Sequence, residues 1–85
     1  MIGLSDLGRE IATARKSARL TQFELAKRAG VSRATIDLLE NGRAREIGYS
    51  KLVRILLVVG LELRLQPLAL ERPTLDDLMR EDTDD

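Results

Sequence analysis

The chain has 85 residues, 44% of them hydrophobic, with only two aromatic side chains and a formal net charge of zero at pH 7. This length and composition predict a single small domain with a modest aliphatic core, which contact with a partner chain would supplement. Cysteine and histidine are both absent, which excludes disulfides, cysteine-ligated metal sites and the common pairing of a catalytic nucleophile with histidine.

A first helix is predicted near the N-terminus. Ser5 and Asp6 suit the start of this helix. Apolar residues then recur at helical spacing along one face, namely Leu7, Ile11, Ala14 and Ala18. We expect this face to pack against the next two helices.

Two further helix starts follow closely. Thr21 and Glu24 form a capping box, in which each side chain bonds a backbone N–H at the start of a helix. Ser32 is the candidate cap of the next helix. Gly30 ends the first of the two helices and Asn41-Gly42 ends the second. A turn this short makes the helices cross steeply, as in a helix-turn-helix, although a plain helical hairpin in a small bundle is the alternative.

The helix that opens at Ser32 has a face that the core does not need. Ile36 and Leu39 turn inward, which leaves one outward stripe made of Ser32, Arg33, Ala34, Asp37 and Asn41. Arginine suits the O6 and N7 atoms of guanine, alanine can touch a thymine methyl group, and serine can serve a base or a phosphate. The stripe is therefore suited to a DNA major groove.

Asp37 is the less usual member of this stripe. Its carboxylate could accept a hydrogen bond from cytosine N4, or it could orient Arg33 one turn earlier. An ordinary surface charge is an equally good interpretation. Leu38, at the margin of the stripe, is a candidate thymine contact or a partly exposed packing residue.

A fourth helix is predicted to begin at Ser50, with Lys51 in its first turn. Residues 52–59 are apolar on nearly every side, and a helix of that kind requires cover all round. We expect a second copy of the chain to supply part of this cover, at Leu56 and Val59. An internal strand is the weaker alternative, suggested by the β-branched residues.

Beyond Gly60 the sequence alternates apolar and polar residues in the manner of a half-buried strand: Leu61, Glu62, Leu63, Arg64 and Leu65. Antiparallel pairing with its own copy, about a two-fold axis at Leu63, would set Glu62 of one chain opposite Arg64 of the other. Pro67 would end the ladder because it has no N–H to donate. The sequence thus predicts a homodimer.

Residues 68–85 are predicted to form an acidic, flexible tail after a domain that spans residues 1–67. A sharper hypothesis is that residues 74–81 become helical on binding a partner protein, with Leu75, Leu78 and Met79 as anchors.

The zero net charge hides an asymmetry. Residues 1–60 carry eleven basic and six acidic side chains, a net charge of +5. Residues 61–85 carry three basic and eight acidic ones, a net charge of −5. The part that contains the predicted reading helix is therefore basic, as a nucleic-acid partner requires.

Other classes of protein find little support in the sequence. Ser, Asp and Glu occur, but none lies in a recognisable catalytic motif, so we expect neither an enzyme nor a cofactor or small-molecule ligand. The residues after Met1 lack the pattern of a signal peptide, and no apolar run is long enough to cross a bilayer. A cytoplasmic location without membrane contact is expected.

Residues 7–60 resemble the helix-turn-helix of the phage lambda repressor and Cro superfamily, the XRE-type regulators. The matching elements are Thr21-Gln22, Glu24-Leu25-Ala26, Ala29-Gly30-Val31-Ser32, Thr35-Ile36 and Leu39-Glu40-Asn41-Gly42. The resemblance implies a lambda repressor-like, all-α fold of four main helices, here followed by the C-terminal strand, and binding to double-stranded operator DNA.

The resemblance also implies roles for residues outside the stripe. Arg15 is expected to pair with Glu40, whose carboxylate would be costly if left unpaired on the inward side of its helix. Gln22 is expected to meet the DNA backbone at a helix N-terminus. The full set of expected phosphate contacts is Thr21, Gln22, Thr35, Arg43, Arg45 and Lys51.

A lambda-type domain that ends in a helix, Gly60-Leu61-Glu62-Leu63 and a short strand is similar to the HipB-like antitoxins. Those proteins dimerise through an intersubunit sheet, repress their own operon and bind a HipA-like kinase toxin. The resemblance implies the same partners here. The alternatives are a stand-alone XRE-type repressor, a protein-interaction module that neutralises an enzyme, and a co-activator that does not read bases.

Overall fold

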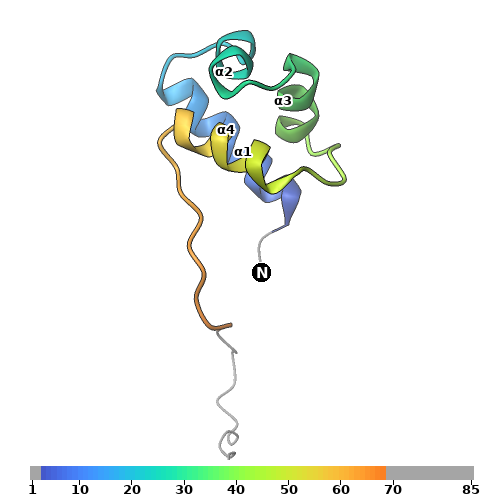
Figure 1. Cartoon of the computed structure of the whole chain (residues 1–85), viewed down its shortest axis with the longest axis vertical. Coiled ribbons are helices and arrows are strands. Elements are labelled where there is room, and N and C mark those ends of the chain that lie inside the picture. Colours follow the sequence, from blue (N-terminus) through green and yellow to red (C-terminus); the bar gives the residue numbers. More distant parts are fainter. Residues whose placement is uncertain (1–2, 69–85) are drawn as a thin grey trace, which may run out of the picture.

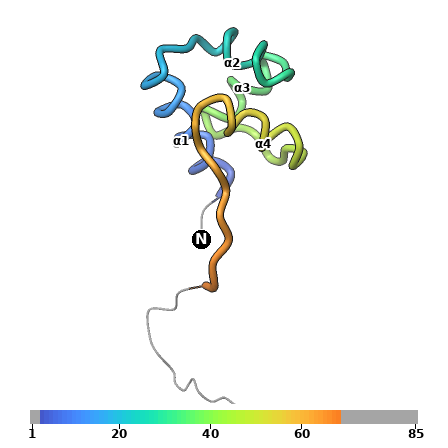
Figure 2. The backbone as a smooth tube through the Cα atoms, turned by 60° about the vertical axis from the view of Figure 1, so that its left-hand side comes forward, coloured from blue at the N-terminus to red at the C-terminus, as the bar shows by residue number. Residues whose placement is uncertain are grey.

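A computed structural model describes residues 3–68 of the chain. Within them it contains the helices α1 (Leu4–Ser17), α2 (Gln22–Ala29), α3 (Arg33–Glu40) and α4 (Tyr49–Val58). The four helices gather into one body, from which residues 61–68 lead away as an extended segment (Figure 1). Figure 2 shows that this segment leaves on the side where α1 begins, with α2 at the opposite end. The predicted four-helix, all-α domain is confirmed.

The starts of α2 and α3 follow the predicted capping chemistry. The hydroxyl of Thr21 accepts the N–H of Glu24 at 3.0 Å, and the carboxylate of Glu24 accepts the N–H of Thr21 at 2.8 Å. The latter bond holds the pKa of Glu24 below its ordinary value. Ser32 Oγ accepts the N–H of Thr35 at 3.1 Å. Gly30, at φ 71°, ends α2 in the left-handed conformation that glycine adopts readily.

The starts of α1 and α4 differ from the prediction by one residue each. α1 begins at Leu4, and Asp6 is its third residue, whose Oδ2 accepts the N–H of Gly3 at 2.9 Å. This bond is the main cause of the lowered pKa of Asp6. α4 begins at Tyr49 rather than Ser50, because the carbonyl of Gly48 already accepts the N–H of Leu52 and closes the first turn.

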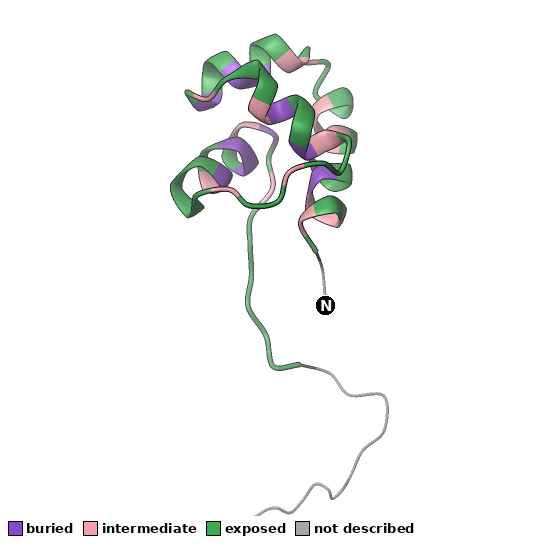
Figure 3. Ribbon diagram, turned by 90° about the vertical axis from the view of Figure 1, so that its right-hand side faces the viewer, coloured by how far each residue is buried: buried purple, intermediate pink, exposed green. Residues whose placement is uncertain are grey.

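The core lies between the helices and is aliphatic (Figure 3). Its largest fully buried side chains are Ile11, Leu25, Ile36, Leu39 and Ile55. α1 and α3 approach each other closely at Gly8, where an added Cβ would lie 1.7 Å from the carbonyl oxygen of Leu39. This contact fixes α3 against α1.

The cover that was predicted to come from a second copy at Leu56 and Val59 is largely supplied within the single chain. These side chains are only 3% and 9% exposed in the single chain. α4 packs against α2, and this places them in the domain's own core. The apolar side chains of α4 that remain exposed are Tyr49 and Leu57.

The expected strand is not formed within residues 61–68 of the single chain. Gly60, at φ 81°, ends the α4 region, and the N–H of Leu61 bonds the carbonyl of Leu56 at 2.8 Å. Leu61 packs partly against the core, whereas Leu63 and Leu65 are exposed. Residues 3–60 offer this segment no neighbouring strand. The hypothesis of an induced helix at residues 74–81 lies outside the described residues.

None of the helices within residues 3–68 has the length and apolar content needed to span a membrane.

Candidate nucleic-acid interface

α3 separates its side chains into two faces. Ile36 and Leu39 are 0% and 1% exposed and belong to the core. The opposite face is exposed and carries Ser32, Arg33, Ala34 and Asp37, which we name the reading stripe. Leu38, beside the stripe, is exposed, while Thr35 is half-buried. The buried face fixes the helix, so the stripe is presented outward without any contribution to the core.

The turn between α2 and α3 is stabilised by a backbone hydrogen bond of its own and by a side chain of α4. The N–H of Val31 bonds the carbonyl of Ala26 at 3.0 Å, and Arg54 Nε donates to the carbonyl of Ala29 at 2.8 Å. Arg54 thus bonds a carbonyl group at the end of α2 that has no partner within the helix. Sequence reasoning did not identify this role. The only signal for it is an arginine within an otherwise apolar helix.

Arg15 and Glu40 form a two-pronged ion pair that joins α1 to the end of α3. Arg15 Nε lies 2.7 Å from Glu40 Oε2, and Arg15 Nη2 lies 2.9 Å from Oε1. The remaining guanidinium nitrogen of Arg15, Nη1, donates to the carbonyl of Leu20 at 2.7 Å. The two side chains are 11% and 7% exposed, and the bond to Glu40 raises the pKa of Arg15. The pair therefore positions α3 relative to both α1 and the turn before α2.

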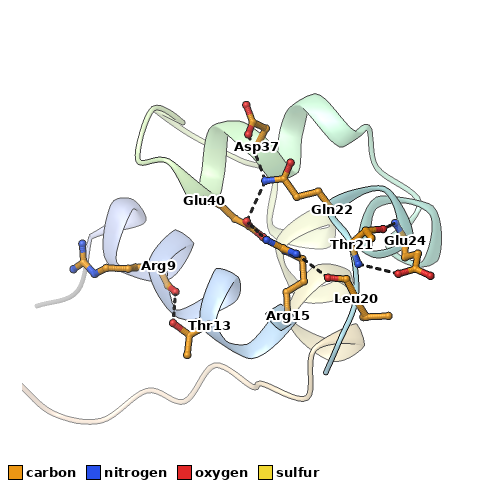
Figure 4. A network of polar contacts seen from close by, with 9 residues as sticks. All are labelled: Arg9, Thr13, Arg15, Leu20, Thr21, Gln22, Glu24, Asp37 and Glu40. Atoms are coloured by element: carbon orange, nitrogen blue, oxygen red, sulfur yellow. Dashed lines mark hydrogen bonds and ion pairs between the residues drawn. The ribbon is translucent and has the colours of Figure 1, made fainter. Parts of the chain in front are cut away.

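The side chain of Gln22 points toward α3, as Figure 4 shows. Its Nε2 donates to Glu40 Oε1 at 3.1 Å and to Asp37 Oδ1 at 3.4 Å. The side-chain amide of Gln22 therefore has no free N–H group with which to make the predicted phosphate contact. Only backbone N–H groups at the start of α2 remain for it.

Within the chain, the carboxylate of Asp37 accepts hydrogen bonds from two side-chain amides. Besides Gln22, its partner is Asn41, whose Nδ2 lies 3.5 Å from Oδ2. Among residues 3–68 no ion pair joins Asp37 to Arg33. The idea that Asp37 orients Arg33 is therefore wrong for this structure.

The candidate phosphate contacts are distributed around α3. Arg43, Arg45 and Thr35 border one shallow depression of about 240 Å³, whose apolar lining includes Leu38 and Ile47. The N–H groups of residues 43 and 44 bond the carbonyl of Leu38 at 2.9 and 3.1 Å, and this folds the loop back against the end of α3. The hydroxyl of Thr35 bonds that of Ser32 at 2.9 Å.

Lys51 and Thr21 lie away from this depression. Lys51 is exposed in the first turn of α4, and Thr21 is exposed at the cap of α2. No contact in the described part of the chain joins them to the reading stripe or to each other. The structure thus gathers three of the six candidates at this depression and leaves the other three at two helix starts, Thr21 and Gln22 at α2 and Lys51 at α4.

A search of residues 3–68 for three or more acidic side chains placed to hold a metal ion finds none. What the interface offers chemically is a set of donors and acceptors on a rigid helix. Such a set can bind a partner and discriminate between partners through hydrogen bonds.

Comparison with known proteins gives one match. The family model described as "Helix-turn-helix domain" matches residues 6–67, which include all four helices apart from the first two residues of α1. Neither the curated proteins nor the solved structures contain a significant match.

Proposed function

The chain belongs to the helix-turn-helix domain family, and from this premise we propose that it is a sequence-specific repressor of transcription. Domains of this family typically bind DNA and regulate transcription without catalysing a reaction. The observation that carries the proposal is the division of α3 into a buried core face and an exposed reading stripe. In a helix-turn-helix the second helix enters the major groove, and its exposed residues contact base edges.

The proposed binding mode assigns donors and acceptors of the reading stripe to base edges. Arg33 matches the paired acceptors of guanine, and Ala34 is small enough to meet a thymine methyl group. Arg43, Arg45 and Lys51 would neutralise phosphates on either side of the groove. The net charge of +5 over residues 1–60 supports this partner. Bound in this way, the protein represses by occluding a promoter.

We propose that the repressor acts as a homodimer. Tyr49, Val53 and Leu57 of α4 border an apolar depression of about 150 Å³ together with Leu61 and Leu63. Glu62 and Arg64 are both exposed, and Glu62 Oε2 lies 3.8 Å from Arg64 Nε in the single chain. An exposed pair of this kind is weak, so each side chain can pair instead with its counterpart in a second copy at little cost. Antiparallel pairing of residues 61–65 would cover the exposed leucines and satisfy the strand's backbone groups.

A finer proposal is that the protein is the antitoxin of a HipBA-like system, which regulates its own operon and binds a kinase toxin. Its support is the resemblance of Gly60-Leu61-Glu62-Leu63 and the following residues to the HipB-like antitoxins. Co-purification with a kinase-like protein encoded in the same operon would support this assignment. A repressor that purifies alone and still represses its own promoter would instead be a stand-alone regulator.

The primary test is selection of duplexes from a random library by the full chain, followed by a footprint on the enriched sequence. We expect an enriched operator with two half-sites about 34 Å apart, one helical turn, because two copies of α3 must reach the same side of the duplex. Binding without any enrichment of sequence would contradict the proposed function.

A further inference from the structure

A chain of polar contacts runs from the interior of the domain to the reading stripe. It begins at Arg15 and Glu40, which are largely buried, and continues through the amide of Gln22 to the exposed carboxylate of Asp37. Figure 4 shows these side chains from three helices facing one another. No other member of the reading stripe is connected in this way to the buried ion pair within residues 3–68.

The position of Gln22 between two carboxylates fixes how its amide is used. An amide oxygen facing Glu40 and Asp37 would be repelled, so the nitrogen faces both, and each of its hydrogens has one carboxylate to bond. The remaining group, the carbonyl oxygen, is an acceptor like a phosphate oxygen. The side chain of Gln22 is therefore suited to holding Asp37 and not to binding the DNA backbone.

Asp37 is held only by neutral donors. Gln22 approaches one carboxylate oxygen and Asn41 the other, at 3.4 and 3.5 Å, and no cation lies within ion-pair distance of it in the described part of the chain. The side chain thus keeps its negative charge on a surface that must approach a polyanion. Such a charge opposes DNA binding unless the DNA supplies a donor to it.

Given the proposed function, we infer that Asp37 selects a base with an amino group on its major-groove edge, and that Gln22 is the positioning residue that aims it. The amino groups available are cytosine N4 and adenine N6. At the same place guanine O6 and thymine O4 present acceptors, which repel the carboxylate. Asp37 thus acts mainly by rejecting wrong sequences, while Arg33 supplies attraction.

The test compares base preferences position by position, using a library in which every base pair of the selected operator is randomised in turn. Wild type is compared with Asp37→Ala, Asp37→Asn and Gln22→Met at one salt concentration. Glu10→Ala serves as the matched control, since it removes one exposed carboxylate from α1, away from the stripe. Thermal unfolding establishes that each variant is folded. If Gln22→Met is unfolded, the two variants at exposed Asp37 are sufficient to test the base preference.

We expect wild type to prefer cytosine or adenine at one position of each half-site. Asp37→Ala should reduce that preference about tenfold and bind random-sequence duplex more tightly, because it removes a negative charge near the phosphates. Asp37→Asn should shift the preference toward adenine. Gln22→Met should weaken the preference about threefold at the same position only. Glu10→Ala should change no preference.

The outcomes separate this inference from the function on which it rests. Wild type that enriches no sequence overturns both. An operator selected equally well at every position by wild type and the Asp37 variants overturns the inference alone. A Gln22→Met variant that is folded and binds all sequences equally less tightly shows that Gln22 contacts the DNA backbone, and this also overturns its positioning role.

Discussion

Gly8 determines how closely α1 and α3 can approach each other. Its missing side chain leaves room for the carbonyl group of Leu39, on the core face of α3. Any Cβ at this position collides with backbone rather than with a movable side chain, so one of the two helices must shift. The orientation of the reading stripe therefore depends on a residue on another helix.

Gly8→Ala should accordingly destabilise the domain by about 1–3 kcal/mol, although alanine favours a helix more than glycine does. Chemical denaturation would measure this loss. Glu10→Ala introduces the same residue on the exposed side of α1 and should change stability by less than about 0.5 kcal/mol. Equal stabilities of the two variants would mean that the close approach of α1 and α3 at Gly8 does not affect stability.

Arg33 and Lys51 should differ in what their removal does to DNA binding. Arg33→Ala should cost about 1–3 kcal/mol and relax preference at one base pair, whereas Lys51→Ala should weaken binding to all sequences and lower the salt slope by about one. Binding to a randomised operator library at several salt concentrations measures both effects. A uniform loss of affinity in both variants would disprove this division of roles.

At the level of helices, polar side-chain contacts join elements in addition to the apolar core. The ion pair of Arg15 and Glu40 joins α1 to α3, and Arg54 joins α4 to the end of α2. The first pair is nearly shielded from water, so removal of one partner leaves a charge with little solvation.

Glu40→Leu should therefore destabilise the domain by about 3–5 kcal/mol. The double variant Arg15→Met with Glu40→Leu should recover a large part of this loss, because no unpaired charge remains in the interior. Urea unfolding of the two single variants and the double variant forms the required cycle. Additive losses in the double variant would show that the two charges do not interact.

The capping carboxylates predict how stability changes with acid. The pKa values of Asp6 and Glu24 are lowered in the folded chain by bonds from backbone N–H groups. Their contribution is therefore present above the ordinary values of 3.8 and 4.5 and is lost as the pH falls through the lowered ones. Thermal unfolding between pH 7 and pH 2 should show a smaller decrease in Tm for Glu24→Gln than for wild type.

These elements also show what a sequence can predict. Thr21 and Ser32 give the starts of α2 and α3 because a capping side chain acts on its own neighbours in the chain. The caps of α1 and α4 are glycines without a side-chain signal, and both starts were misplaced by one residue. Leu56 and Val59 were assigned to a partner because an apolar pattern does not reveal which face meets the domain's own core. The link from Gln22 to Asp37 depends on how α2 crosses α3, which no local pattern encodes.

The whole molecule combines a small core with an extended apolar segment. The leucines of residues 61–65 alternate with charged residues. Leu61 packs partly against the core, whereas Leu63 and Leu65 are exposed, as is Leu57 of α4. A helical domain of this size gains core by pairing such segments between copies. The proposed dimer would thus set the distance between two reading stripes.

Leu63→Asp should convert the proposed dimer to a monomer and weaken binding to a two-half-site operator, with little effect on a single half-site. Light scattering gives the mass, and titration of the two duplexes gives the affinities. Phe23→Asp, at an exposed position on α2, is the control for a new acid on the surface and should keep the dimer. A wild-type chain that is monomeric at all concentrations would exclude the dimer.

The carboxylate of Glu40 is shared, since Oε1 accepts from both Arg15 and Gln22. One atom thus serves the packing of α1 on α3 and, through a neighbour, the setting of Asp37. In a lineage that diverges toward a new operator, Asp37 can change without exposing a buried charge, but Glu40 cannot change alone without leaving Arg15 unpaired in the interior. We therefore expect changes in operator specificity to arise from substitutions at Asp37 and Gln22 together, while the Arg15–Glu40 ion pair is retained.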